Sequence, residues 1–370
     1  MQVTGTRQRE AWLRREFPPV EEVTSGVWSV PVPIPDSPLR YVLTYLIEHR
    51  SGFLMVDPGW DHPDSWRALT AGLESCGIPL TAITAVVITH VHPDHHGLSR
   101  AVREQTGAWI GMHEREDAFL ADHADWALLQ DGLRQYLRWC GAPPEHLADL
   151  AGQRAGRPQP GPMARADRLI GHGDLIDVPG LALRAVWTPG HSPGHLCFHD
   201  ETRGLLLTGD HVLPRITPNI SAYDMTSSPL DDYLRSLAAL RGMEPGEVLP
   251  AHEYRFADLD GRLADLAAHH QERLTEITDA LSSARTRLSA WQVAAQISWS
   301  RPWDQLRGFP RQAALGEVVA HLRHLQLQGW AECADSGGLG LWAHVADRPV
   351  LESSGLESSG LESSGLESSG

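Results

Sequence analysis

Short apolar runs separated by turn residues fill the first part of the chain. Three such runs follow one another between residues 26 and 57, each bounded by glycine, proline or charged residues. This pattern is typical of consecutive antiparallel strands. The β-branched run at 83–89 indicates a strand buried on both faces. Between them, apolar residues at helical spacing over 66–76 predict a helix that ends at Gly77.

The middle of the chain contains a long helical stretch, with further predicted strands before and after it. Residues 114–150 are mainly helical in pattern, and a connector rich in proline, glycine and arginine follows at 152–162. Two β-rich halves, each followed by helices, suggest a sandwich of two sheets with helices outside. Further strands are expected at 108–112, 174–178, 181–188, 196–199, 204–208 and 247–249, with helices at 98–106 and 230–240.

Beyond residue 263 the pattern becomes helical and ends in a hairpin, which suggests a winged-helix module. We therefore divide the chain into residues 1–262, with a helical insertion at about 114–162, and residues 263–350. Residues 351–370 are four copies of Leu-Glu-Ser-Ser-Gly, which we interpret as an appended flexible tail outside the fold. The helices of the second part are expected at 263–283, 290–297 and 312–328, and the hairpin within 329–345.

The composition excludes several classes of function. The formal net charge is −16, so tight binding to nucleic acid is not expected, because phosphate binding is driven by clustered lysine and arginine. The sequence contains no lysine, which excludes a Schiff-base lysine, a pyridoxal phosphate anchor and a lysine-bearing phosphate loop. The N-terminal residues lack the apolar core of a secretory signal, and the four cysteines are scattered singly. We expect a cytoplasmic protein without a membrane partner.

Three histidines and an aspartate lie within six residues, at His90, His92, Asp94 and His95. Imidazole and carboxylate groups at this spacing converge only where the chain turns sharply, as metal ligands do. A histidine-rich surface loop is the alternative. The adjoining His96 is explained equally well as a substrate contact or as a structural neighbour.

Three further candidate ligands, His191, Asp210 and His252, each follow an apolar strand directly. Residues at the same ends of adjacent strands meet at one edge of a sheet, where sites are usually placed. His195 and His211 adjoin these ligands. Like His96, each is explained equally well as a substrate contact or as a structural neighbour.

This arrangement resembles the metallo-β-lactamase superfamily over roughly residues 20–260. The resemblance implies an α/β fold, a four-layer αββα sandwich, here followed by a small helical winged-helix-like domain. Asp57, in Val-Asp-Pro-Gly, matches the family's aspartate that orients a ligand histidine, whereas a simple turn is the alternative. The implied metal ligands are His90, His92 and His191 for the first metal, Asp94, His95 and His252 for the second, and Asp210 as a bridge.

The resemblance also implies a chemistry. Two cations close together lower the pKa of a shared water, so that a metal-bridging hydroxide is available near neutral pH. Asp94 would orient this nucleophile and carry a proton. Nitrogen and carboxylate ligands suit two zinc ions best, with iron or manganese as alternatives.

Two later features point to different branches of the family. The run His252-Glu253-Tyr254 is similar to the glyoxalase II group of thioester hydrolases, in which the tyrosine helps to bind substrate. Packing beneath the ligand loop is the alternative for Tyr254. The segment that begins at His269 and His270, themselves expected to be ordinary surface or helix residues, resembles lactamase-β-like hydrolases with a C-terminal winged helix, some of which cut single-stranded RNA. We expect the winged-helix-like module to be a cap or a homodimer surface.

The sequence therefore predicts a dinuclear metal-dependent hydrolase of a small-molecule thioester or other carboxylic ester. A single-strand RNA endonuclease and a mononuclear iron sulfur dioxygenase are the alternatives. The aromatic residues Trp126, Tyr136 and Trp139 of the insertion favour a lid over an apolar or acyl substrate, although a helical pair that packs only on itself would look the same.

Overall fold

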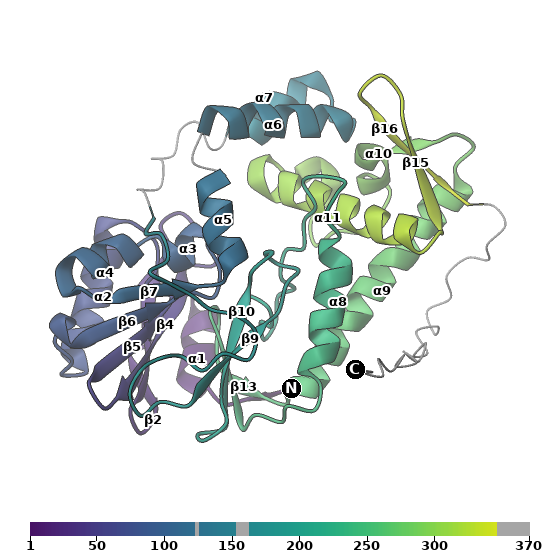
Figure 1. Cartoon of the computed structure of the whole chain (residues 1–370). Helices are drawn as coiled ribbons and strands as arrows, with labels where there is room; N and C mark the ends of the chain where they lie inside the picture. Colours follow the sequence, from purple (N-terminus) through teal and green to yellow (C-terminus); the bar gives the residue numbers. More distant parts are fainter. Residues whose placement is uncertain (123–125, 153–162, 346–370) are drawn as a thin grey trace, which may run out of the picture.

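The structure, a computed structural model, describes residues 1–122, 126–152 and 163–345. The predicted tail and nearly all of the predicted connector lie outside the described residues. Two sheets pack face to face, and helices cover the outer face of each (Figure 1). This arrangement confirms the predicted four-layer αββα sandwich.

The first half of the chain forms a seven-stranded sheet in the order β2-β3-β4-β5-β6-β7-β8. The pairs from β2 to β5 are antiparallel, as predicted for the first runs, whereas the pairs from β5 to β8 are parallel. The strands are β2 (Glu21–Thr24), β3 (Val27–Pro33), β4 (Tyr41–His49), β5 (Gly52–Val56), β6 (Ile83–Val87), β7 (Trp109–Met112) and β8 (Arg168–Leu169).

The second half contributes a six-stranded sheet in the order β1-β13-β12-β11-β10-β9. In this sheet β11 and β12 are parallel, and β10 is antiparallel to both β9 and β11. Strands β9, β11 and β12 therefore run in the same direction and end at the same edge. The strands are β1 (Gln2–Val3), β9 (Leu183–Trp187), β10 (Leu196–Asp200), β11 (Leu205–Gly209), β12 (Glu247–Pro250) and β13 (Phe256–Ala257).

Strand β4 shows why the sandwich forms. Tyr41, Leu43 and Tyr45 point to the core between the two sheets, and Val42 and Leu46 point to the core beneath the outer helices. A strand with apolar residues on both faces has to be covered on both sides. Strand β4 is therefore covered by the other sheet on one side and by a layer of helices on the other.

Helices α2 and α4 lie on the outer side of the seven-stranded sheet, and α8 and α9 lie beside the six-stranded sheet (Figure 1). Helix α9 begins at Leu259, earlier than predicted and on the N-terminal side of the predicted domain boundary, because Asp258 accepts a hydrogen bond from the backbone of Gly261 and caps it. The helices that accompany the two sheets are α1 (Thr6–Arg14), α2 (Pro63–Ser75), α3 (Pro93–His96), α4 (Ser99–Thr106), α8 (Pro229–Leu240) and α9 (Leu259–Ser283).

The C-terminal region adds one short and one long helix and a three-stranded sheet in the order β14-β16-β15. Its last two strands form the predicted hairpin. The description of this module as a winged helix stays a prediction, as does the division into domains. Its elements are β14 (Leu288–Ser289), α10 (Ala290–Ala294), α11 (Gly308–Leu327), β15 (Ala331–Asp335) and β16 (Gly340–His344).

The insertion consists of α5 (Glu114–Asp122), α6 (Trp126–Trp139) and α7 (Pro144–Gly152). It does not pack only on itself, because its apolar residues join the core of the C-terminal module (Figure 1). The ring of Trp139 lies 6.3 Å from that of Trp342, and the backbone of Trp291 donates a hydrogen bond to Cys140. The side chain of Trp126 lies outside the described part of the structure. The lid role of the insertion stays a prediction.

The predicted strand at 174–178 is wrong. This segment forms only an isolated bridge between Leu175 and Arg184. Ile176 and Val178 are nevertheless buried in the core between the sheets. Alternating apolar residues here reflect a loop that docks into the core without pairing as a strand. In the described part of the chain, no helix is both long and apolar enough to span a membrane.

Candidate metal centre

The predicted ligands come from four strand ends. His191, Asp210 and His252 follow β9, β11 and β12, which end at one edge of the six-stranded sheet. The motif that begins at His90 follows β6 of the other sheet and runs into the short helix α3. Because the two sheets are packed face to face, all seven side chains meet at a shared edge.

The first group is made of three imidazole rings. The Nε2 atom of His90 lies 2.9 Å from Nδ1 of His92 and 3.2 Å from Nε2 of His191, and the last two nitrogens are 3.1 Å apart. This is the set that the family resemblance assigns to the first metal.

The second group contains Asp94, His95 and His252. The Oδ2 atom of Asp94 lies 3.8 Å from Nε2 of His95 and 3.5 Å from Nε2 of His252. Asp210 lies between the groups, since its Oδ1 atom is 3.2 Å from Nε2 of His252 and its Oδ2 atom is 3.6 Å from Nε2 of His191. Its position suits a bridging carboxylate.

Backbone and side-chain acceptors fix which nitrogen of each ring faces the cluster. His95 donates from Nδ1 to Asp57 over 2.8 Å, and His252 donates from Nδ1 to the carbonyl of Tyr41 over 2.8 Å. His191 donates from Nδ1 to the carbonyl of Asn219 over 2.9 Å. The Nε2 atoms of these rings then present lone pairs to the centre, as in metal sites whose outer partners set the histidine tautomer.

Asp57 has an unusual backbone conformation for this task. Its φ angle is 54°, in the left-handed region that aspartate tolerates better than most residues. One carboxylate oxygen accepts from the backbone of Thr89 over 2.8 Å, and the other accepts from the Thr89 hydroxyl over 2.7 Å. The aspartate therefore holds the start of the histidine motif, and residues 57–60 form no hydrogen-bonded turn.

The electrostatics of the two groups differ. Burial, together with the neighbouring His191, lowers the pKa of His92 to about 3. Burial also opposes protonation of His252, but Asp210 and Asp94 outweigh it and raise its pKa to about 10. Conversely, burial acts to raise the pKa of Asp94, yet His95 and His252 lower it to about 2. The two carboxylates thus favour a proton on His252, which a metal ion at this position would displace.

These residues fit metal ions. Three buried atoms, His95 Nε2, His252 Nε2 and Asp210 Oδ1, have no hydrogen-bond partner, although buried polar atoms are normally paired. Lone pairs that converge without a donor between them are stabilised by a cation in their midst, and metal binding displaces the protons of such ligands. The cluster is therefore a candidate metal-binding site.

The other predicted site residues lie around the cluster. Tyr254 is buried with Arg9 of α1 as a hydrogen-bond partner, and its role in substrate binding stays a prediction. His96 donates to the carbonyl of Ala164 over 2.9 Å, and His195 accepts from the backbone of Asp210 over 3.2 Å. His96 and His195 thus have structural partners.

Sequence analysis missed Glu116, which is buried and accepts hydrogen bonds from the backbones of Val91 and Gly194. Its signal was weak because it stands among other acidic residues in the first turn of α5. Its position shortly after the end of β7, a strand parallel to β6, was the available clue.

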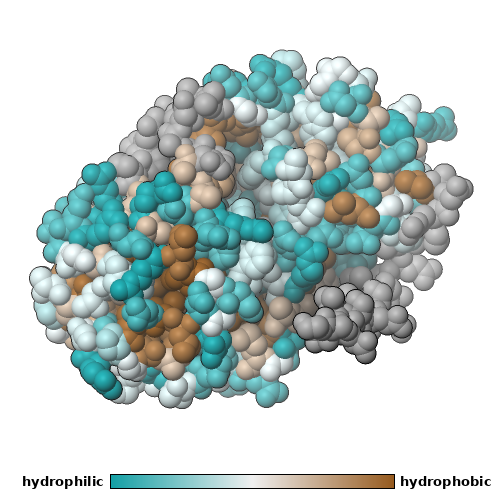
Figure 2. All heavy atoms as spheres, viewed as in Figure 1, coloured by the Kyte–Doolittle hydropathy of each residue, from teal (hydrophilic) through white to brown (hydrophobic). Residues whose placement is uncertain are grey.

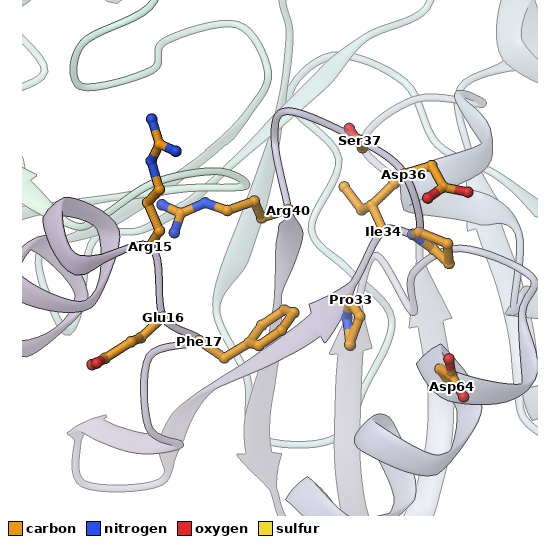
Figure 3. A pocket seen from close by; sticks show the side chains of 10 residues that line it. Arg15, Glu16, Phe17, Pro33, Ile34, Asp36, Ser37, Arg40 and Asp64 are labelled. Atoms are coloured by element: carbon orange, nitrogen blue, oxygen red, sulfur yellow. The ribbon is translucent and has the colours of Figure 1, made fainter.

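A surface cavity of about 430 Å³ lies beside the loop between β3 and β4. Phe17 reaches toward Pro33 across it, and Arg40 lies on the adjoining wall (Figure 3). None of the predicted ligands lines this cavity. It is therefore separate from the candidate metal centre, although the carbonyl of the neighbouring Tyr41 accepts the hydrogen bond of His252.

Comparison with known families agrees with this geometry. The model of the metallo-β-lactamase superfamily matches residues 37–252, and the chain belongs to this superfamily. The crystal structure of a metallo-β-lactamase family protein from Thermus thermophilus is similar, with a TM-score of 0.72 and 28% identity over 88% of this chain and 100% of that one. This similarity extends beyond the part that the family model matches.

Two curated relatives are similar over most of their length. The lactamase-like protein adaB of Aspergillus niger is 26% identical over 286 residues, or 76% of this chain and 72% of that protein. The probable metallo-hydrolase YqjP of Bacillus subtilis is 24% identical over 294 residues, or 74% of this chain and 85% of that protein. Family, relatives and cluster together support a metal-binding hydrolase.

Proposed function

We propose that this protein is a dinuclear metal-dependent hydrolase of thioesters or other carboxylic esters. The observation that carries the proposal is the convergence of seven histidine and aspartate side chains in three overlapping groups, with Asp210 close to both His191 and His252. His90, His92 and His191 would hold one metal, and Asp94, His95 and His252 the other. Two bound cations would supply an activated water at neutral pH and polarise the substrate carbonyl. We expect zinc, because its ligands are commonly imidazole and carboxylate.

Asp94 is the proposed catalytic residue. Its side chain is 14% exposed, more than the adjacent His95 and His252, both of which are 0% exposed. A carboxylate at the open side of the cluster accepts a proton from the attacking water and returns it to the leaving group. Asp57 keeps His95 in the required tautomer.

The acyl substrate and the cytoplasmic location are part of this proposal. The net charge of −16 is unfavourable for a nucleic-acid partner.

Large hydrophobic residues such as Leu169 and Leu175 are exposed beside β8 and β9, and hydrophobic surface, drawn in brown, gathers on the sandwich half in Figure 2. We retain a homodimer as part of the proposal, with the C-terminal module as cap or contact surface.

The test compares zinc-loaded wild type with Asp94→Ala on a panel of acyl thioesters and carboxylic esters. We expect Asp94→Ala to lower kcat/KM by about 10²-fold or more, the usual size of a proton-transfer contribution. Asp64→Ala is the matched control, since Asp64 is an exposed aspartate that pairs with Arg67.

Unchanged hydrolysis by Asp94→Ala would contradict the mechanism. Cleavage of single-stranded RNA at low salt, without thioester cleavage, would favour the endonuclease alternative. One iron per chain with oxygen consumption would favour the dioxygenase alternative.

A further inference from the structure

Glu116 joins the two loops that carry the three-histidine group. Its Oε2 atom accepts a hydrogen bond from the backbone of Val91 over 2.8 Å, and its Oε1 atom accepts one from the backbone of Gly194 over 2.6 Å. The side chain is fully buried. A buried carboxylate that is satisfied by backbone N–H groups is held in a defined geometry.

The two donors belong to ligand loops from different sheets. Val91 lies between His90 and His92 after β6, and Gly194 follows His191 in the loop after β9. The insertion thus reaches into the seam between the two sheets through the first turn of α5, and one carboxylate spans the seam.

Gly194 is adapted to this contact. A Cβ atom at this position would lie 2.8 Å from Cγ of Glu116 and 2.9 Å from its backbone nitrogen. Only glycine lets the loop after β9 approach α5 so closely. Glycine at position 194 and glutamate at position 116 are therefore both suited to this close contact.

The second group has different supports. His95 depends on Asp57, and His252 depends on the carbonyl of Tyr41. Neither Asp57 nor Tyr41 is among the hydrogen-bond partners of Glu116. A change at Glu116 should therefore act on the three-histidine group and spare the other.

We propose that Glu116 is a positioning residue that sets the metal affinity of the His90, His92 and His191 site by fixing its two loops relative to each other. This inference rests on the proposed function, because it concerns the same metal centre. It adds that the helical insertion is part of that centre.

The experiment measures zinc per chain after desalting, and the affinity of each site by competition with a chromophoric chelator. The variants are Glu116→Gln, which turns an amide N–H₂ toward one donor, and Gly194→Ala, which keeps the carboxylate but displaces it. Asp117→Asn is the matched control, because Asp117 stands next in α5 and also accepts from a backbone N–H, that of Ala166 over 2.9 Å, away from the ligand loops.

We expect two zinc ions per chain in wild type and in Asp117→Asn. In Glu116→Gln and Gly194→Ala one zinc should remain tight and the other should bind at least about tenfold more weakly, as when an outer partner of a ligand is removed. The melting temperature of the metal-free forms separates this from a structural role, which would lower stability and weaken both sites equally. If Glu116→Gln does not fold, Gly194→Ala still tests whether Glu116 sets the metal affinity of the three-histidine site.

Wild-type affinity at both sites in Glu116→Gln, or equal weakening of both, would overturn the inference. A wild-type chain that binds fewer than two zinc ions would overturn the inference and the proposed function together. A wild type that binds two zinc ions and shows the expected effect of Glu116→Gln, but cleaves no ester or thioester, would overturn the proposed function alone.

Discussion

Among the described residues, buried histidines gather in two places, and only one of these places resembles a metal site. The first is the cluster at the edge of the sandwich. The second lies between α9 and α11, where Nδ1 of His270 is 3.1 Å from Nε2 of His321 and the Nδ1 atom of His321 donates to the carbonyl of Glu317 over 2.7 Å. In the described part of the chain, groups of three metal-capable side chains occur only in the first cluster.

The difference is in the neighbours. At the sandwich edge, carboxylate oxygens and ring nitrogens converge on common positions. Between the helices, burial lowers the pKa of His270 and brings that of His321 to about 3, so both rings are neutral and bond to each other. Histidine density alone is therefore no guide to a metal. Convergence with carboxylates is the deciding feature.

The largest expected effect is that of Asp210→Ala. The change removes the carboxylate that faces both groups, so both metals should be lost and ester hydrolysis should fall on the order of 10³-fold. Metal analysis and kinetics on the same preparation check this. Asp200→Ala is the control, since Asp200 is a buried aspartate at the end of β10 that pairs with Arg203. Retention of both metals by Asp210→Ala would show that this carboxylate is not needed to hold them.

Asp57→Asn should have an intermediate effect. The amide would present an N–H₂ to Nδ1 of His95 in place of an acceptor, so the second metal should bind about 10–100-fold more weakly. The first metal should be weakened less, because Asp57 reaches His90 only through Thr89. Chelator competition measures both sites. His270→Gln changes a buried histidine of the other cluster, and its metal content should equal that of wild type. Loss of metal in His270→Gln would show that the second histidine cluster also supports metal binding.

Glu317→Gln should have the smallest effect, on stability alone. Burial raises the pKa of Glu317 to about 7 from 4.5, although Arg273 opposes the shift. Between these two pH values the unfolded chain releases its proton first, so stability falls as pH rises through this window and stays low above it. Glu317→Gln should remove this loss.

We expect Glu317→Gln to be more stable than wild type by about 3 kcal/mol at pH 8, with no difference near pH 4.5. Urea unfolding at both pH values measures this. Glu272→Gln, an exposed change on α9, is the control. An equal gain at both pH values would show that packing and not ionisation is responsible.

Much of the sandwich was predictable because its strands are strongly patterned. Strand β4 and the run that became β6 are apolar on both faces, a pattern that few other structures accommodate. Helix α1 (Thr6–Arg14) was missed because it is mostly polar and buries only Gln8 and Ala11. The segment at 174–178 was mistaken for a strand because a docked loop and a strand bury alternate residues alike.

The sequence by itself determined the ligand types and their position after strands. Histidines and aspartates that directly follow apolar runs are a local signal, since strand periodicity ends where the ligand begins. The resemblance to a known family then assigned seven residues to two metals, and the structure brings the same seven together.

Only the tertiary structure decided which groups support these ligands. Glu116, the carbonyl of Tyr41 and the carbonyl of Asn219 touch the site from segments far away in the chain. A backbone carbonyl has no residue signature, and one buried glutamate looks like any other in sequence. Such contacts arise when sheets and helices pack, so they depend on distance in space and not on spacing along the chain.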